Sequence, residues 1–179
     1  MAKQFLVITI LSDDHPGVVK LLAKTISDHG GSWLESRMSQ LAGKFAGILK
    51  VTIDDSQITS LAAALTQLKA RGIQVLIDRA FFQEHDASKS TPKKTFSFEL
   101  VGADNVGIVH ELSQAFTDKG ISIDELETYC SSMPWSGEPL FQANGKLLAP
   151  ETTNTHELLE QLDNIADNLG VDISLTEKF

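Results

Sequence analysis

The chain reads ILSDDHPGVV at residues 10–19 and LVGADNVGIV at residues 100–109. In both stretches an apolar run meets an acidic residue, then a glycine, then two branched aliphatic residues that open a helical pattern. The two glycines, Gly17 and Gly107, are 90 positions apart. The same offset relates three further pairs of identical residues: Asp28 and Asp118, Gly30 and Gly120, Glu35 and Glu125. A repeat at domain-sized spacing predicts two copies of one fold.

Composition narrows the classes of protein that fit. The 179 residues can hold two small domains, and 42% hydrophobic with 22% charged residues is ordinary for a globular protein. The net charge of −9 predicts little direct binding of nucleic acid, because clustered Lys and Arg carry affinity for phosphate backbones. No apolar run is long enough to span a membrane, and residues 1–5 show no signal-peptide pattern. With Cys130 as the single cysteine, these features predict a cytoplasmic protein.

The first half follows the order β-α-β-β-α-β. Residues 5–11 are almost all apolar and β-prone, which predicts a central strand buried on both faces. Asp13 or Asp14 can cap the helix that follows, with Pro16 in its first turn. The remaining elements are a helix to Gly30, a hairpin over 33–41 and 45–53, a helix over 58–68 and a strand over 73–82. This order predicts an α+β, ferredoxin-like fold with two helices covering one face of a sheet.

The same order returns after a polar segment. Residues 85–94 read as a linker by composition, which predicts domains over 1–84 and 95–179. In the second half the strand over 140–148 reads as interrupted by Asn144-Gly145. Gly72 and Gly170 are 98 positions apart rather than 90, so the second copy carries eight extra residues. We expect them in the hairpin loop at residues 133–139, where Met133 and Trp135 either pack back on their domain or contact a partner.

The repeated turn is the candidate binding site. A chain that enters a helix from a strand leaves several backbone N–H groups free, and with the helix dipole they favour a carboxylate. A glycine lets a small ligand approach the backbone, and acidic or amide oxygens can accept hydrogen bonds from an ammonium group. An amino acid carries both groups. The candidate ligand-binding residues are Asp14, His15, Gly17 and Val18 in the first turn and Asp104, Asn105, Gly107 and Ile108 in the second. The alternative is a helix cap and a glycine turn without any ligand.

Residues for catalysis or metal binding are not apparent. None of the five histidines lies at zinc-site spacing from another histidine or from Cys130, which is expected to be a buried, inert thiol. No nucleophile elbow, phosphate-binding loop or zinc-protease motif occurs. The sequence therefore predicts no catalytic residues, no metal site and no cofactor.

At this point the residues resemble a known family. Two β-α-β-β-α-β units, each opening with a strand, an acidic turn, a glycine and a branched aliphatic pair, are similar to tandem ACT domains. Residues 5–19, FLVITILSDDHPGVV, match the ACT opening in which D-x-P-G precedes the first helix. The tandem arrangement resembles the glycine cleavage system transcriptional repressor family. The second turn departs from the pattern at Val106, where proline is expected, and the loop at residues 133–139 is longer than in a minimal unit.

The resemblance implies a function. ACT units commonly bind a small amino acid, here suspected to be glycine, at the turn before the first helix and often between ACT units. The repressor family is implied to act on glycine cleavage genes through another transcription factor or regulatory protein. We therefore expect a non-enzymatic amino-acid sensor, with no residues left for a catalytic domain. Because a sheet with helices on one face leaves its other face to be covered, we also expect a homodimer or a close face-to-face packing of the two units. Two alternatives stay open: a regulatory subunit of an amino-acid-metabolism enzyme, and an interaction module that has lost ligand binding.

Overall fold

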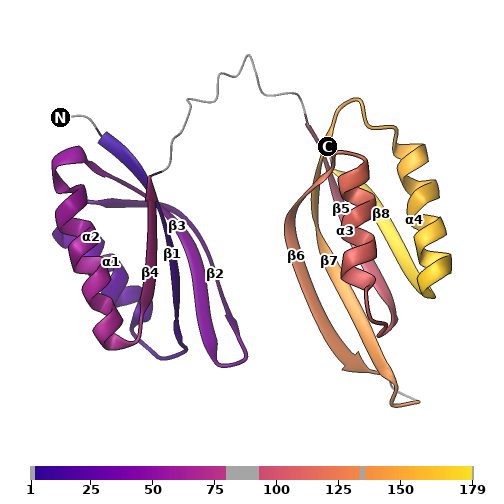
Figure 1. Cartoon of the computed structure of the whole chain (residues 1–179), viewed down its shortest axis with the longest axis horizontal. Coiled ribbons are helices and arrows are strands. Elements are labelled where there is room, and N and C mark those ends of the chain that lie inside the picture. The colour runs from indigo at the N-terminus through magenta and orange to yellow at the C-terminus, as the bar shows by residue number, and fades with distance from the viewer. Residues whose placement is uncertain (1–2, 80–92, 134–135, 179) are drawn as a thin grey trace. The chain divides into compact units, whose positions relative to one another are not determined.

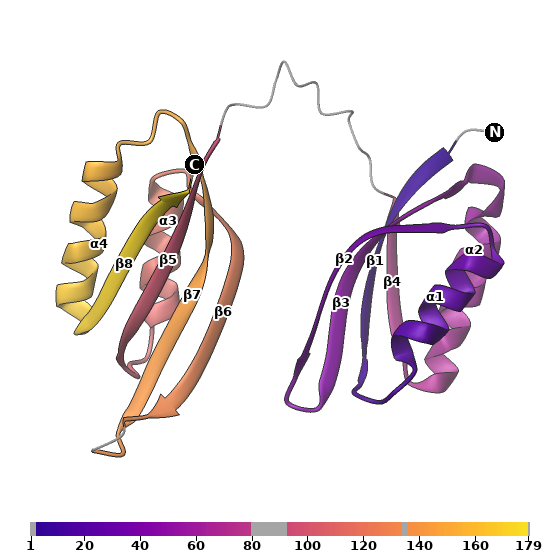
Figure 2. The same ribbon diagram turned by 180° about the vertical axis from the view of Figure 1, so that it is seen from behind.

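The computed structural model describes residues 3–79, 93–133 and 136–178. The chain divides into two compact units, Met1–Asp86 and Ala87–Phe179. Each unit is an antiparallel four-stranded sheet with two helices on one face (Figures 1 and 2). The α+β, ferredoxin-like arrangement is confirmed in both halves. Most of the predicted linker lies outside the described residues, but Lys93 and Lys94 belong to a strand and not to the linker.

The elements of the first unit follow the predicted order. They are β1 (Lys3–Asp13), α1 (Val18–Asp28), β2 (Ser32–Leu41), β3 (Lys44–Asp54), the 3-10 turn η1 (Asp55–Gln57), α2 (Ile58–Gln67), the 3-10 turn η2 (Leu68–Arg71) and β4 (Gln74–Arg79). The strand order β2-β3-β1-β4 places β1 in the interior of the sheet. Helix α1 ends at Asp28, just before the predicted stop at Gly30, which has a φ of 72° and lets the Gly31 N–H reach the Ile26 carbonyl at 2.9 Å. The end of the predicted strand over 73–82 lies outside the described residues.

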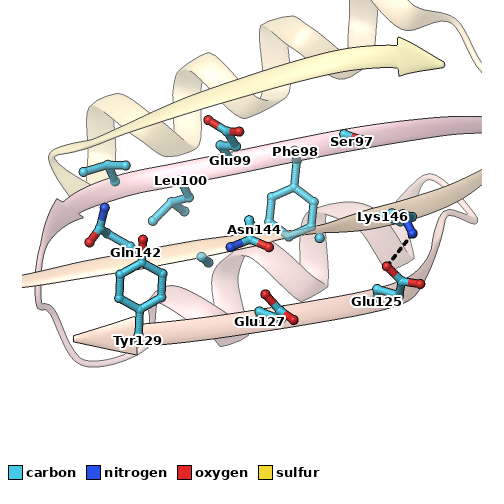
Figure 3. A pocket seen from close by; sticks show the side chains of 13 residues that line it. Ser97, Phe98, Glu99, Leu100, Glu125, Glu127, Tyr129, Gln142, Asn144 and Lys146 are labelled. Atoms are coloured by element: carbon cyan, nitrogen blue, oxygen red, sulfur yellow. Dashed lines mark ion pairs between the residues drawn. The ribbon is translucent and has the colours of Figure 1, made fainter. Parts of the chain in front are cut away.

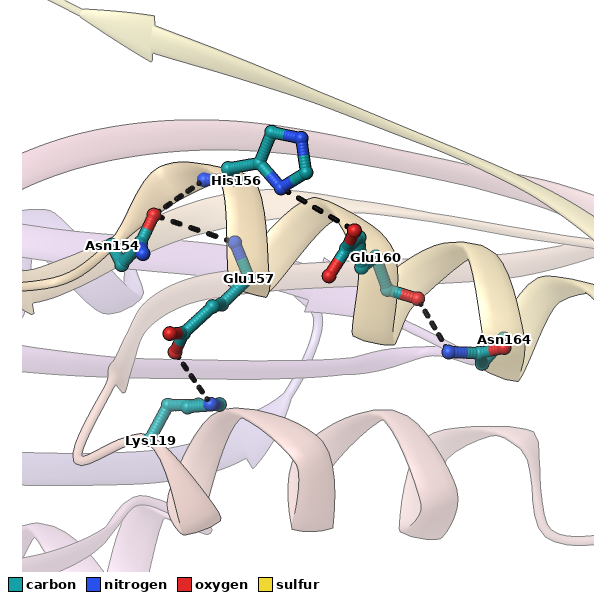
Figure 4. Close-up of polar contacts among 6 residues, drawn as sticks. All are labelled: Lys119, Asn154, His156, Glu157, Glu160 and Asn164. Carbon is teal, nitrogen blue, oxygen red and sulfur yellow. Dashed lines mark hydrogen bonds and ion pairs between the residues drawn. The ribbon is translucent and has the colours of Figure 1, made fainter.

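The second unit repeats this topology. Its elements are β5 (Lys93–Ala103), α3 (Ile108–Asp118), β6 (Ser122–Ser132), β7 (Pro139–Pro150), α4 (Thr155–Leu169) and β8 (Val171–Lys178), with strand order β6-β7-β5-β8. In Figure 4 the amide oxygen of Asn154 caps α4 by accepting from the backbone N–H groups of His156 and Glu157, at 3.1 and 3.5 Å. An ion pair of 3.3 Å between Lys119 and Glu157 joins α3 to α4.

The core of each unit lies between the sheet and its helices. In the first unit Leu6, Ile8 and Ile10 of β1 pack with Leu22 and Ile26 of α1, and all five side chains are buried. The expectation that β1 is buried on both faces is wrong for the unit taken by itself. Phe5 and Leu11 point away from the helices and are 37% and 42% exposed. The helices cover one sheet face only, so the apolar run on the other face stays accessible.

Strand β7 is continuous, which corrects the predicted interruption at Asn144-Gly145. Gly145 pairs with Phe98 on one side and Leu126 on the other. A Cβ built at this glycine would lie 2.1 Å from the Glu125 carbonyl oxygen and 2.7 Å from the Phe98 ring. The glycine therefore makes room for neighbouring atoms inside a strand and does not mark a turn.

The eight extra residues of the second unit are not all in the hairpin loop. Ser12 pairs with Phe45, and Gly102, which is 90 positions after Ser12, pairs with Phe141. Phe45 and Phe141 are 96 positions apart, so six of the extra residues lie in the β6–β7 loop. The other two lie between β7 and Gly170, because the offset grows from 96 to 98 there. Trp135 of this loop lies outside the described residues.

Candidate functional site

The turn between β1 and α1 has a defined backbone conformation. The Asp14 N–H donates to the Gly43 carbonyl at 2.9 Å, which joins the turn to the tip of the β2–β3 hairpin. Gly17 occupies the N-cap position with φ 103° and ψ −7°, and its carbonyl accepts from the Leu21 N–H at 2.9 Å. This φ lies in the region that favours glycine. A Cβ at Gly17 would meet no atom within 4 Å, so the glycine is needed for its backbone conformation and not for packing inside the unit.

The predicted capping by Asp13 or Asp14 is wrong, because no side chain caps α1. The Asp13 carboxylate instead forms an ion pair with Lys44 across the β1–β3 ladder. The hydrogen bond from the Lys44 ammonium and its positive charge hold the pKa of Asp13 below its ordinary value. Pro16 precedes the N-cap, so it also lies before the first helical turn rather than inside it. The Asp14 side chain is exposed.

The four predicted residues of the first turn have different surroundings. His15 is exposed, and its ring Nδ1 lies 3.4 Å from the Pro16 carbonyl oxygen. Val18 is only 3% exposed and packs in the core, so any ligand contact of Val18 would use its backbone N–H. Ser12, which was not predicted, is 4% exposed, and its hydroxyl has no hydrogen-bond partner within the described part of the chain. A buried hydroxyl without a partner is uncommon and is often found beside a binding site or a bound water.

The second turn has the same backbone geometry with other side chains. Gly107 has φ 99° and ψ −5°, and the Asp104 N–H donates to the Pro139 carbonyl at 3.1 Å. The Asn105 side-chain amide donates to the Leu169 carbonyl at 3.1 Å, so this residue joins the turn to the end of α4. Ile108 is 2% exposed and belongs to the core. The structure therefore brings the eight predicted residues together as two separate groups of four, one in each unit.

A groove on the open sheet face of the second unit was not predicted. It has a volume of 430 Å³ and is lined mainly by polar side chains of β5, β6 and β7. Figure 3 shows Glu99, Glu127 and Asn144 side by side across the sheet, with Glu125 and Lys146 paired at 2.6 Å. Along each strand these polar residues alternate with core residues. Which of them lie next to one another across the sheet depends on the register of the strands, which the sequence alone does not show.

Three further features of the sequence can be compared with the structure: Cys130, groups of possible metal ligands and apolar helices. Cys130 is exposed, which corrects the expected buried thiol. Within residues 3–79, 93–133 and 136–178, no three His, Cys, Asp or Glu side chains are placed to hold a metal ion. None of the helices in the described ranges combines the length and apolar character needed to cross a bilayer.

Comparison with known proteins identifies the first unit. Residues 4–77, which include the turn at Asp14–Val18, match the family model of the ACT domain. The first unit is an ACT domain. The second unit repeats the ACT topology with the same strand order and the same glycine turn. No protein of curated function matches the chain.

Among the solved structures that resemble the chain are two that match it over nearly its whole length. A protein of unknown function from Galdieria sulphuraria is 27% identical with a TM-score of 0.81, over 99% of this chain and 100% of its own. A candidate glycine cleavage system transcriptional repressor is 21% identical with a TM-score of 0.73, over 99% of both chains. The second likeness shows a shared fold. Both likenesses extend over the two units of this chain.

Proposed function

We propose that this protein is a non-enzymatic, amino-acid-sensing regulator in the cytoplasm. Its ligand is a small amino acid, with glycine as the first candidate, and it controls expression of glycine cleavage genes through a protein partner. The observation that carries the proposal is the position of the Asp14–Val18 turn inside the part of the chain that matches the ACT domain. The full-length likeness to a candidate glycine cleavage repressor supports the choice of pathway.

The first turn is the better ligand site of the two. Gly17 leaves open space above the backbone, and the N–H groups at the start of α1 can receive a carboxylate. The exposed Asp14 carboxylate can accept hydrogen bonds from the ammonium group, and His15 can add a polar contact. The buried Ser12 hydroxyl lies near the end of β1, two residues before Asp14 in the sequence. In the second turn the Asn105 side chain already donates to the Leu169 carbonyl, and Gly102 occupies the position equivalent to Ser12.

Affinity measurements on matched variants test this site. We expect Asp14→Ala to weaken binding of the amino acid by about 1.5–3 kcal/mol, or roughly ten- to hundred-fold, because a hydrogen bond to a charged group is lost. Asp104→Ala is the matched control and is expected to change affinity much less. The ligand is first found by a thermal-shift screen of amino acids on the full chain, since a ligand that prefers the native state raises the melting temperature. If no amino acid raises it, the chain is an interaction module without a ligand.

The partner is tested by co-purification of the full chain. Our proposal expects a DNA-binding protein among the captured partners, and the purified chain alone should not shift operator DNA at sub-micromolar concentration. The net charge of −9 is the reason for expecting no direct contact with DNA. Capture of an amino-acid-metabolism enzyme instead would favour the regulatory-subunit alternative.

We further propose a homodimer formed through the open sheet face of the first unit. Ile48, Leu76 and Leu11 lie on that face and are 48%, 62% and 42% exposed. Ile48 and Leu76 pair with Thr9 from the two neighbouring strands. At the same positions of the second unit, Asn144 and Ser174 pair with Glu99, so polar side chains replace the two apolar ones. A second copy would bury the apolar face, as an exposed patch of this kind favours. Sedimentation of the full chain should therefore show a dimer. The double variant Ile48→Asn with Leu76→Ser should be a monomer. Val101→Leu, in the second unit, is the control and should remain a dimer.

A further inference from the structure

A cationic cavity lies on the helix side of the first unit. It has a volume of 350 Å³ and forms where the start of α1 approaches η2. Lys20, Lys24 and Arg71 line it together with the apolar side chain of Leu21. A second cavity of 290 Å³ between α1 and α2 shares Leu21 and Arg71 with the first. Three cations around one cavity are a local reversal of charge in a chain with a net charge of −9.

The balance of charge in the cavity favours a dianion. The Lys24 ammonium donates to both carboxylate oxygens of Asp28, at 3.0 and 2.8 Å, so its charge is largely compensated. Lys20 and Arg71 leave about two positive charges, which match a phosphate monoester with its charge of about −1.5 to −2 at pH 7. The planar guanidinium of arginine is also suited to paired hydrogen bonds with phosphate oxygens. A zwitterionic amino acid carries no net charge and would leave the charges of Lys20 and Arg71 uncompensated.

The second unit provides an internal comparison. The counterparts of Lys20, Lys24 and Arg71 are His110, Gln114 and Leu169, so no lysine or arginine occupies these positions. Gln114 donates to Asp118 at 2.7 Å, which repeats the Lys24–Asp28 contact with a neutral amide. Neither the fold nor the duplication therefore requires the positive charge, which is particular to the first unit.

We propose that this cavity binds the phosphate group of a small molecule, with Arg71 and Lys20 as its charged contacts. The apolar side chain of Leu21 and the adjoining α1–α2 cavity can receive an uncharged remainder of such a ligand. Free phosphate and an organic phosphate monoester share the recognised chemistry. His15, Pro16 and Gly17 of the Asp14–Val18 turn also line the cavity, so a phosphate bound there would lie beside the proposed amino-acid site. Asp14 does not line the cavity, and its variants therefore separate the two proposals.

The test is an NMR titration of the full chain at constant ionic strength, with inorganic phosphate and with glycerol 3-phosphate as probes. We expect amide shifts concentrated at Gly17, Lys20, Leu21 and Arg71. Arg71→Gln should weaken binding at least tenfold and Lys20→Gln severalfold. Lys69→Gln is the matched control, because Lys69 lies in η2 but does not line the cavity, and it should change affinity less than twofold. Tighter binding of glycerol 3-phosphate than of phosphate identifies an organic ester as the ligand type.

Three results would overturn the proposal. The first is equal weakening by Arg71→Gln and Lys69→Gln, which would mean general charge attraction. The second is phosphate binding that survives Arg71→Gln in a variant with an unchanged melting curve. The third is Arg71-dependent binding of a short oligonucleotide without binding of either small probe, which would assign the cations to nucleic acid. Glycine affinity, measured separately on Asp14→Ala, reports on the proposed function and not on this cavity.

Discussion

The two units share a backbone and differ in how their side chains use it. Gly17 and Gly107 adopt nearly the same φ, 103° and 99°, and each turn donates one N–H to the neighbouring hairpin. Yet Asp13 pairs with Lys44 in the first unit, whereas the same ladder position of the second unit holds Ala103 opposite Leu140. The comparison teaches that the fold requires the glycine and the hairpin contact. The charges around the first turn are not required by the fold and are the better guide to function.

The cores also differ, through compensating changes of size. Ile8 and Leu49 are neighbours across the first sheet, and their counterparts Phe98 and Gly145 are neighbours across the second. The Phe98 ring also packs against Phe116, with ring centroids 5.5 Å apart. A larger side chain on β5 is therefore accommodated by a missing side chain on β7.

The largest expected effect comes from breaking this compensation. Gly145→Ala should destabilise the protein by about 3 kcal/mol, because the new Cβ meets both the Glu125 carbonyl oxygen and the Phe98 ring. Urea unfolding measures it. Combining Gly145→Ala with Phe98→Ile should cost less than the sum of the two changes, since the ring contact is then absent. Strict additivity would show that Phe98 and Gly145 are not coupled.

The turns should respond alike to loss of their glycines. Gly17→Val and Gly107→Val are each expected to lower the free energy of unfolding by about 1–2 kcal/mol, because a branched side chain is strained at positive φ. The asparagine variants at the same positions are the controls and should cost less, since asparagine tolerates this conformation. A clear difference between the two valine variants would contradict the equivalence of the two backbones.

The residues that follow Asp14 and Asp104, which are His15 and Asn105, should contribute differently to the stability of the two units. Asn105→Ala is expected to lower stability by about 0.5–1 kcal/mol, since it removes the hydrogen bond to the Leu169 carbonyl. His15→Ala should leave stability nearly unchanged, because the His15 ring is exposed and its contact with Pro16 is long. Thermal unfolding of both variants decides, and equal losses would remove this difference between the units.

The smallest effect is a pH dependence that comes from the Asp13–Lys44 pair of the first unit. The pKa of Asp13 is lowered by Lys44, so the pair contributes stability above the ordinary carboxyl pKa of 3.8 and loses it as pH falls through the lower, folded-state pKa. NMR titration of Lys44→Gln should move the pKa of Asp13 back toward 3.8. Lys24→Gln is the control, since Lys24 pairs with Asp28, and it should leave Asp13 unchanged.

Much of this architecture could be predicted because repeated patterns reveal repeated elements. Residues 42–44 predicted the first hairpin, and Ala42 and Gly43 do form its turn with positive φ. The predicted interruption at Asn144-Gly145 was wrong because the residue type alone does not show whether a glycine forms a turn or makes room for neighbouring atoms inside a strand. Capping by Asp13 was wrong because its carboxylate pairs with Lys44, 31 positions later, and capping by Asp14 was wrong because the N-cap position is Gly17. Arg71 could not be connected with Lys20, since only the packing of η2 against α1 brings them to one cavity.

The hydrogen bond between the Asp14 N–H and the Gly43 carbonyl has a mechanical consequence. Any ligand that draws the Asp14 backbone toward itself must either break this bond or carry the tip of the β2–β3 hairpin with it. The second unit has the same linkage from Asp104 to Pro139, where six more residues extend the hairpin. Because β2 and β3 are paired along their length, a movement of the hairpin tip would displace both strands, including the edge strand β2. A sensor built this way can report an occupied site to a partner that never touches the ligand.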